Sequence, residues 1–231
     1  MVRYLLPNSS FPDPAEADEN GLVAIGGRLT TRTLIEAYKK GIFPWFNYPP
    51  ILWYSLCPRM VLLPQELYVG RTLRNSIRKQ RFTITLDTSF RKVISSCARK
   101  KRPDQNGTWI NKDMINAYSR LHTSGYAHSC EAWLDDKLVG GLYGISLGRA
   151  FYGESMFANE SDASKIAFVY LVKQLQKWKF HIIDCQMETD HLTRFGAKLY
   201  KREIFQATLQ KALQYTTKKE KWKFDDDLQI F

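Results

Sequence analysis

Apolar side chains recur every three or four residues in some segments of the chain and every second residue in others, which separates predicted helices from predicted strands. A short amphipathic helix carries Leu34, Ile35 and Tyr38 and stops at Gly41. Asp162 is expected to cap a helix that runs to about Leu175. The same helical spacing predicts further helices over residues 69–79, 90–97, 112–125 and 203–213. Alternation predicts strands over residues 82–86, 128–134, 138–146, 150–154 and 180–186.

Prolines and glycines interrupt the beginning of the chain, and a loop rich in aromatic side chains covers residues 41–50. Pro58 and Pro64 indicate a boundary near residue 60. We therefore predict an α+β protein with a small N-terminal α/β domain over residues 1–60 and a second domain over residues 61–231. In the second part, helices, antiparallel hairpins, a long helix and a further strand follow the order of the α/β sandwich of N-acyltransferases (a GNAT-like fold).

Enzymes with that sandwich hold the phosphate of their acyl carrier on the backbone N–H groups of a basic, glycine-rich turn at the start of a helix. The corresponding segment here, residues 153–162, contains three acidic residues and a single glycine. Acyl-CoA would bind poorly to such a turn. If the chemistry is acyl transfer, the sequence favours a different carrier.

Positive charge is concentrated in one stretch of the chain. The 34 Lys and Arg outnumber the 23 Asp and Glu, giving a net charge of +11, and residues 67–102 alone hold eleven basic side chains against Asp87. Arg71, Arg74, Arg78 and Arg81 recur at helical spacing, which places them on one face. Either that face is merely solvated or it binds a phosphate backbone, and the lack of mixed charge favours nucleic acid. The basic residues of this stretch are Arg71, Arg74, Arg78, Lys79, Arg81, Arg91, Lys92, Arg99, Lys100, Lys101 and Arg102.

Other chemistries find little support in the sequence. The four histidines lack metal-ligand spacing, and no phosphate-binding GxxxxGK[ST] motif is present, so we expect neither a metal nor ATP hydrolysis. No apolar run approaches the ~20 residues of a membrane span. The cysteines have no CxxC spacing and indicate a reducing compartment, so we expect a cytoplasmic protein; they are Cys57, Cys97, Cys130 and Cys185.

Two carboxylates near predicted strand ends are candidates for chemistry. Asp184 and Gln186 lie two residues apart on a strand, so both should face one side while Cys185 faces the other. Glu154 is expected to end the neighbouring strand. Such a pair suits an amine and ribose hydroxyls, although a helix cap at the strand end and a surface salt bridge are the structural alternatives.

Two tryptophans on predicted loops are candidates for stacking on a base. Trp45 lies in the aromatic loop, and Trp109 follows the basic stretch. Stacking on an aromatic side chain contributes ~1–3 kcal/mol per base. A place in the core is an equally good interpretation of each tryptophan taken alone.

These motifs together resemble the bacterial leucyl/phenylalanyl-tRNA–protein transferases. The resemblance covers roughly residues 10–215, with many blocks in the same order and spacing. The blocks are FPDP at 11, NGLVAIGG at 20, EAYKKGIFPWF at 36, LWYS at 52, PR at 58, GTWI at 107, AYSRLH at 117, GYAHSCE at 125, LVGGLYG at 138, FYGESMF at 151, ASK at 163 and IIDCQ at 182.

The resemblance implies a fold, a reaction and partners. A small N-terminal domain precedes an acyltransferase-like domain that does not use acyl-CoA. Leu, also Phe and to a lesser degree Met, moves from aminoacyl-tRNA to the α-amino group of a protein that begins with Arg or Lys. The product is marked for adaptor-mediated proteolysis. The activated ester drives the reaction, so the resemblance implies no cofactor and no metal, and it implies a monomer.

It also implies roles for particular residues. Asp184 would hold the incoming ammonium and take its proton, and Gln186 would orient the reacting groups or relay that proton. Glu154 would hold the terminal adenosine or the amino group. Trp45 and Trp109 would sandwich the terminal adenine. The residues that would follow the tRNA backbone are Arg71, Arg74, Arg78 and Lys79. The apolar wall around the amino acid would be Leu142, Phe151, Met156, Phe168, Leu171 and Ile183.

The sequence departs from the family at two pocket positions. Met is frequent in the family at the position of Leu142, and Phe at that of Leu171. A smaller side chain at 171 would widen the pocket and favour Phe as the transferred amino acid. Such a change shifts the preference by ~1–3 kcal/mol. Two alternatives remain: an N-acyltransferase with another acyl carrier, and a non-catalytic tRNA-binding module.

Overall fold

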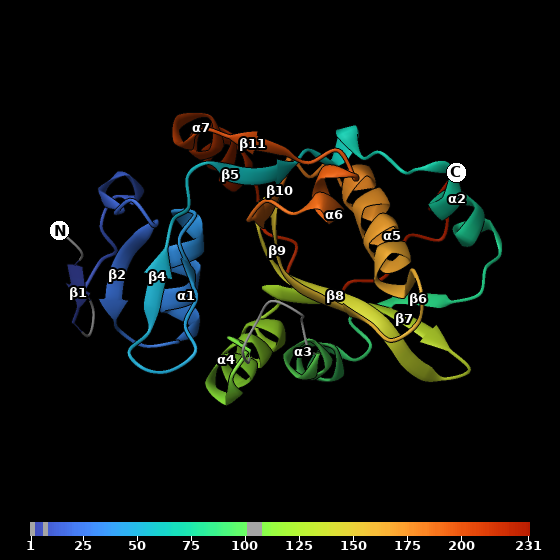
Figure 1. Ribbon diagram of the computed structural model, residues 1–231, viewed down its shortest axis with the longest axis horizontal. Helices are drawn as coiled ribbons and strands as arrows, with labels where there is room; N and C mark the ends of the chain where they lie inside the picture. Colours follow the sequence, from blue (N-terminus) through green and yellow to red (C-terminus); the bar gives the residue numbers. More distant parts are fainter. Residues whose placement is uncertain (1–2, 7–8, 101–107) are drawn as a thin grey trace.

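The computed structural model describes residues 3–6, 9–100 and 108–231, and its strands form two sheets (Figure 1). The first sheet has four strands in the order β1-β2-β4-β3. Its strands are β1 (Arg3–Leu5), β2 (Leu22–Gly26), β3 (Phe43–Pro44) and β4 (Leu52–Tyr54).

The second sheet has seven strands in the order β11-β5-β10-β9-β8-β7-β6. Every neighbouring pair is antiparallel except β9 and β10, which run parallel with Asp184 opposite Tyr152. The strands are β5 (Arg59–Leu62), β6 (Thr83–Leu86), β7 (Ala127–Leu134), β8 (Lys137–Leu147), β9 (Ala150–Ala158), β10 (Ile182–Gln186) and β11 (Lys198–Tyr200).

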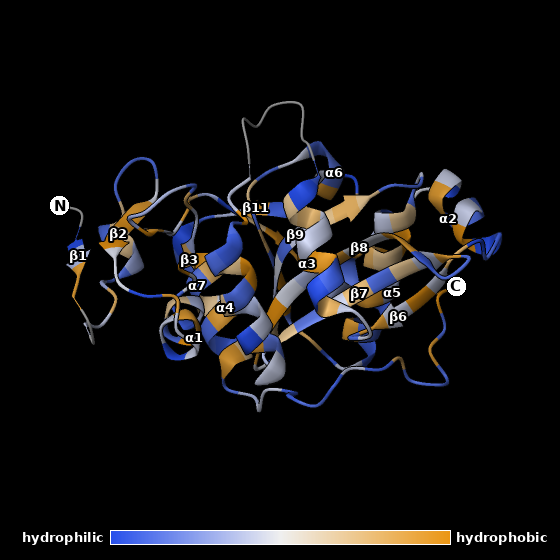
Figure 2. Cartoon of the chain, turned by 90° about the horizontal axis from the view of Figure 1, so that it is seen from below, coloured by the Kyte–Doolittle hydropathy of each residue, from blue (hydrophilic) through white to orange (hydrophobic). Residues whose placement is uncertain are grey.

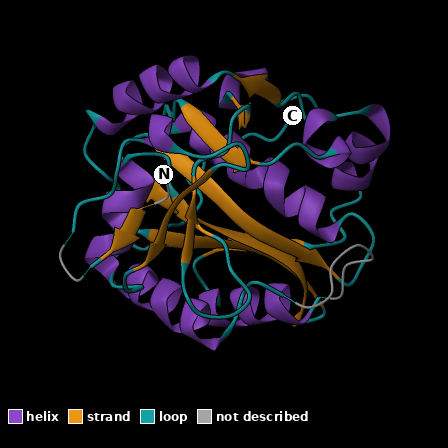
Figure 3. Cartoon of the chain, turned by 60° about the vertical axis from the view of Figure 1, so that its left-hand side comes forward, coloured by secondary structure: helices purple, strands orange, loops and turns teal. Residues whose placement is uncertain are grey.

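Helices lie on both sides of this central sheet, as the side view shows (Figure 3). One core joins the first sheet to four helices: α1 (Thr31–Lys39), α3 (Phe90–Arg99), α4 (Lys112–Thr123) and α7 (Arg202–Leu213). A second core lies beneath α5 (Ala163–Lys177) and α2 (Arg71–Arg78). The short helices are η1 (Pro14–Glu16), η2 (Pro64–Glu66) and α6 (Asp190–Thr193). The predicted α+β class is confirmed, and the antiparallel hairpins are followed by the long helix α5 and the further strand β10, as expected.

The hydropathy of the chain follows this layering. Hydrophobic residues gather on the sheet and on the sides of the helices that face it, whereas outer turns are hydrophilic (Figure 2). Thr30 caps α1 by accepting the N–H of Thr33, and Asn111 caps α4 by accepting that of Met114. Asp162 is the N-cap residue of α5, as expected, but its side chain makes no capping hydrogen bond. Asp162 has a left-handed φ of 62°, and its carboxylate accepts hydrogen bonds from Ser76 and Lys165 instead.

The chain changes sheets between Tyr54 and Arg59, beside the predicted boundary at residue 60. The first core is nevertheless continuous across that boundary, because Phe43 and Trp53 belong to the same cluster as Tyr118. The division into domains 1–60 and 61–231 therefore stays a prediction.

The segment after α7 returns to the central sheet. Trp222 is 0% exposed and enters the second core, where its ring stacks on His128 at 3.7 Å between centroids. Its backbone N–H donates to Asp87 Oδ2 at 2.8 Å, and His128 Nδ1 is 2.7 Å from the same oxygen. The last residues of the chain thus complete the packing beneath α5.

Candidate active site

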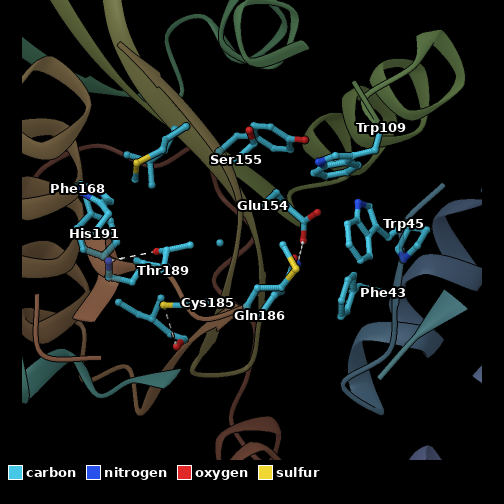
Figure 4. A pocket seen from close by; sticks show the side chains of 18 residues that line it. Phe43, Trp45, Trp109, Glu154, Ser155, Phe168, Cys185, Gln186, Thr189 and His191 are labelled. Carbon is cyan, nitrogen blue, oxygen red and sulfur yellow. Dashed lines mark hydrogen bonds between the residues drawn. The ribbon is translucent and has the colours of Figure 1, made fainter. Parts of the chain in front are cut away.

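A cavity of about 370 Å³ opens where the first sheet meets the middle of β9 and the end of β10 (Figure 4). Trp45, Trp109 and Phe43 lie on one side of Glu154, and Phe168 and His191 lie at the other end. The cavity is lined by Phe43, Pro44, Trp45, Trp109, Leu142, Tyr143, Gly153, Glu154, Ser155, Met156, Phe168, Ile183, Cys185, Gln186, Met187, Thr189, His191 and Leu192. One end is therefore aromatic, the middle polar and the far end largely apolar.

Both predicted tryptophans line this cavity, although they come from segments 64 residues apart (109 − 45). Trp45 follows β3 and packs edge-on against Tyr54 at 5.5 Å between centroids. Trp109 precedes α4 and belongs to the described residues 108–231. Both tryptophans are on the same side of Glu154 (Figure 4), and their role in binding adenine stays a prediction.

Glu154 lies inside β9 rather than at its end, because the strand continues to Ala158. Its side chain is 8% exposed and has three hydrogen-bond partners. Tyr38 Oη donates to Oε1 at 2.7 Å, Tyr118 Oη donates to Oε2 at 3.1 Å, and Gln186 Nε2 donates to Oε1 at 3.1 Å. Residues from α1, α4 and β10 thus converge on one carboxyl group.

The surroundings of Glu154 favour its protonated form. Burial raises its pKa from 4.5 to about 7, and the hydrogen bonds from Tyr38 and Tyr118 only partly oppose that rise. The two phenol oxygens are also 2.5 Å apart. The contact between the phenols and their two contacts with the carboxyl group are three hydrogen bonds, for which the phenols supply only two protons. Protonation of Glu154 supplies the third proton. The carboxyl group can accordingly exchange a proton near neutral pH.

Asp184 does not line the cavity. Arg59 Nε and Nη2 donate to its two carboxylate oxygens, each at 2.7 Å, and both side chains are 1% exposed. A substrate ammonium could reach Asp184 only by displacing this buried ion pair. The expected direct contact of Asp184 with the incoming amine therefore does not fit the geometry.

The pairing of β10 with β5 is irregular at its end. A bulge separates Asp184 from Gln186 in the pairing with β5, and Gln186 has a left-handed φ of 63°. Asp184 and Gln186 nevertheless face the first core, as expected, and Cys185 packs against the second. Asp184 pairs with Arg59 beside Phe205, and the Gln186 amide donates to Glu154. Gln186 and Cys185 line the cavity, whereas Asp184 does not.

Four of the six predicted wall residues line the cavity: Leu142, Met156, Phe168 and Ile183. The other two lie in the second core. Phe151 packs against the ring of Trp222, at 6.0 Å between centroids. Leu171 is buried one turn along α5 from Phe168. The expected widening of the pocket through Leu171 therefore has no structural basis.

Several residues of the site were not predicted from the sequence. Tyr38 and Tyr118 occupy apolar positions of their helices and resemble core residues there. His191 lines the far end, and burial together with Lys165 and Arg194 lowers its pKa, which favours the neutral ring. Burial raises the pKa of the Cys185 thiol, which disfavours a thiolate nucleophile.

The basic stretch does not form a single surface. Arg71, Arg74 and Arg78 lie exposed along α2, with Lys79 at its end. Arg81 lies beyond the helix and pairs with Glu160 at 2.8 Å. Arg91, Lys92 and Arg99 are on α3, which packs in the other core, and Lys101 and Arg102 fall outside the described residues. Only the α2 residues keep the predicted arrangement, and their contact with tRNA stays a prediction.

Neither a metal centre nor a membrane span is found in the described ranges. No group of three or more His, Cys, Asp or Glu side chains there is arranged to hold a metal ion. None of the helices in those ranges is long and apolar enough to cross a membrane.

The chain matches two family models. The leucyl/phenylalanyl-tRNA protein transferase model covers residues 61–210, and the model of that family's N-terminal domain covers residues 27–56. A leucyl/phenylalanyl-tRNA–protein transferase of Nitrosospira multiformis is 53% identical over 98% of this chain and 99% of its own length. The Myxococcus xanthus relative of the same name is 50% identical over 96% and 97%, and that of Saccharophagus degradans is 55% identical over 91% and 88%.

Two solved structures resemble the chain distantly. L-PGS from Bacillus licheniformis aligns with a TM-score of 0.41 at 8% identity, covering 67% of this chain and 64% of that one. A Bacteroides thetaiotaomicron protein of unknown function aligns with a TM-score of 0.43 at 12% identity, covering 81% and 64%. These likenesses add nothing to the assignment, which the sequence matches carry by themselves. The chain belongs to the leucyl/phenylalanyl-tRNA–protein transferase family.

Proposed function

We propose that this chain transfers Leu or Phe, and to a lesser degree Met, from aminoacyl-tRNA to the α-amino group of proteins that begin with Arg or Lys. One observation carries the proposal. A single cavity has two tryptophans at one end, an apolar wall at the other and a hydrogen-bonded Glu154–Gln186 pair between them. An aminoacyl ester of adenosine needs a stacking site, a polar centre at the ester and an apolar site, in that order.

The reaction needs no energy source beyond the ester. The acceptor nitrogen attacks the carbonyl carbon, a C–N bond forms, and the C–O bond to the ribose breaks. One proton leaves the acceptor nitrogen and one proton is delivered to the ribose oxygen, so the products are an amide and a free tRNA 3′ end. Holding both reactants in one cavity supplies much of the rate.

Glu154 is the best placed of the cavity residues to accept the proton of the acceptor amine. Its pKa of about 7 lies close to the ~7.7–8.0 of an α-amino group, so proton transfer between them is nearly balanced. Gln186 would hold the carboxylate and the reacting carbonyl in register. Trp45 and Trp109 would stack on the terminal adenine, and Leu142, Met156, Phe168 and Ile183 would surround the transferred side chain.

The partners follow from this assignment. We propose that the tRNA acceptor stem lies against Arg71, Arg74, Arg78 and Lys79, and that the chain acts as a monomer in the cytoplasm, where charged tRNA is available. The new N-terminal Leu or Phe would mark the acceptor for adaptor-mediated proteolysis.

The test is transfer of radiolabelled Leu or Phe from tRNA to a peptide that begins with Arg, with ATP and CoA omitted. We expect label on the peptide, none on the same peptide with an acetylated N-terminus, and much less on a peptide that begins with Ala. Label that appears only when CoA is added would favour an N-acyltransferase with an ordinary carrier. Tight tRNA binding without transfer to any peptide would favour a binding module.

A further inference from the structure

We propose that Arg59 is a positioning residue that acts through Asp184 to hold Gln186 against Glu154. The meaning of this contact for catalysis rests on the proposed function, whereas the contact itself does not. Three links carry the inference: the ion pair between Arg59 and Asp184, the bond from Asp184 to the backbone of residue 186, and the bond from the Gln186 side chain to Glu154.

The first link is rigid. Arg59 is the first residue of β5, and its guanidinium donates from Nε and Nη2 to both oxygens of Asp184 at 2.7 Å. The guanidinium carbon also lies over two rings, 4.7 Å from the centroid of Phe43 and 4.9 Å from that of Phe205. Bidentate pairing and these two ring contacts restrict the orientation of Arg59. The two hydrogen bonds from Arg59 thereby fix the Asp184 carboxylate.

The second link sets the backbone at the end of β10. Asp184 Oδ1 accepts the N–H of Gln186 at 3.0 Å, which closes a tight turn over Cys185. Gln186 is held at a φ of 63°, a conformation that side chains other than Gly rarely adopt. The same oxygen that accepts this N–H also accepts Arg59 Nε. Removing either Arg59 or the Asp184 carboxylate would therefore release the constraint.

The third link reaches the reacting centre. With its backbone in the left-handed region, Gln186 directs Nε2 to Glu154 Oε1 at 3.1 Å. This side chain lies on the same face of the sheet as Asp184, whose carboxylate holds the backbone N–H of residue 186. The position of the amide in the cavity therefore depends on the backbone conformation that Asp184 stabilises.

The energetics of buried ion pairs favour a role in geometry over one in stability. Desolvation offsets most of the attraction within such a pair, and apolar side chains of similar volume often replace it without loss. Arg59 Nη1 is also buried without a hydrogen-bond partner among the described residues, which is a further cost. The pair is a poor way to stabilise the core but an effective way to fix one orientation.

The decisive variant exchanges the pair for apolar side chains. Arg59→Met combined with Asp184→Leu removes both charges together, so the protein should fold, but nothing then holds the N–H of Gln186. Arg59→Lys keeps the charge without the bidentate geometry and should rescue part of the function. Glu131→Gln is the matched control, because Glu131 is a buried carboxylate on β7 with five hydrogen-bond donors that does not line the cavity.

The first measurement needs no substrate. The side-chain amide signals of Gln186, assigned by their loss in Gln186→Leu, should titrate in the wild-type NMR spectrum with a midpoint at the pKa of Glu154, about 7. We expect this titration to disappear in the double variant and to persist in Glu131→Gln. If the double variant folds and keeps the full titration, Arg59 and Asp184 do not position Gln186 and the inference is wrong.

The second measurement is the transfer rate at a temperature where all variants are folded. We expect kcat of the double variant to fall ~100-fold with the KM for Leu-tRNA within about twofold, since misplacement by an ångström costs about that much. Wild-type kcat in the double variant would show that the pair is structural only. Loss in Asp184→Asn with full activity in Arg59→Met would show that Asp184 acts directly on substrate. If wild-type protein transfers no label, the proposed function fails, and the NMR titration still decides the inference.

Discussion

Glu154 combines burial with contacts that keep it reactive. An isolated carboxyl group in an apolar site would stay protonated well above neutral pH, whereas the phenol groups of Tyr38 and Tyr118 stabilise the anion and bring the pKa back to about 7. Burial also raises the pKa of both phenols well above 10, so they act as donors at neutral pH. The residue can therefore be a base in one step and an acid in the next.

Glu154→Gln should lower the single-turnover transfer rate by ~10²–10⁴, the usual contribution of a general base. It should also remove the part of the pH–rate profile that rises around pH 7, where the carboxyl ionises. The acceptor amine itself titrates at ~7.7–8.0, so only the limb that disappears in the variant belongs to Glu154. An unchanged profile at an unchanged rate would place the base elsewhere.

The same substitution should raise stability while it lowers activity. Because folding raises the pKa of Glu154 from 4.5 to about 7, its contribution to stability is complete below pH 4.5 and is lost as the pH rises through 7. Glutamine cannot ionise, so the variant should gain about 2–3 kcal/mol relative to wild type between pH 5 and pH 8. Urea unfolding at the two pH values measures this difference, and equal differences at both would contradict the raised pKa.

At the scale of single residues, the sequence predicts Glu154, Gln186, Trp45 and Trp109 in the cavity, and all four line it. The resemblance to a known family carries most of that success. Arg59 and the two tyrosines could not be predicted, because a tyrosine at an apolar helix position looks like core. An arginine beside a strand looks exposed until its partner 125 residues away is known.

At the scale of elements, helix α2 is distinguished by its unmixed charge. Its only buried side chain is that of Ile77, while three arginines are exposed along its length. Because little of this helix is buried, its arginines stay hydrated and are free to bind an anion. Phosphate oxygens are suitable partners for a row of arginines.

Arg71→Glu combined with Arg78→Glu should weaken binding of Leu-tRNA roughly tenfold or more at low salt. The slope of log K against log salt should fall by ~1 for each arginine that no longer binds a phosphate. Arg91→Glu combined with Lys92→Glu on α3 is the control, with the same change of charge in the other layer. If that control weakens binding equally, net charge rather than the α2 face governs the affinity.

Periodicity predicts the longer elements well and the short ones poorly. The helices α3, α4 and α7 and the hairpin of β7 and β8 lie within a few residues of their expected positions, because each has a long apolar repeat. The short strands β1, β5 and β11 were not predicted, since three or four residues carry no readable period. The bulge in β10 lies in its pairing with β5, a strand remote in sequence, and no local pattern contains that pairing.

At the scale of the whole molecule, the two cores are closed by segments remote in sequence. The first sheet supplies Trp53 to the core of α3 and α4, and the last segment supplies Trp222 to the core of α5. Each core is thus completed by a segment from another part of the chain. The final segment therefore belongs to the core although it forms no helix or strand.

Trp222→Ala should accordingly destabilise the whole protein by about 3–5 kcal/mol, as expected for a large buried aromatic side chain. The free energy of unfolding in urea measures the effect, with Lys221→Ala, an exposed neighbour, as the control. A loss below about 1 kcal/mol would mean that the segment is only loosely attached.

The hydrogen bonds that meet at Glu154 also constrain how the protein folds. Tyr38 is 116 residues from Glu154 and 80 from Tyr118, so these groups can meet only after long loops have closed. Contacts of that separation form late, after local helices and hairpins are in place. A partly folded chain can hence contain nearly all of its secondary structure and still lack the hydrogen bonds around Glu154. We therefore expect transfer activity to appear only in the last step of folding.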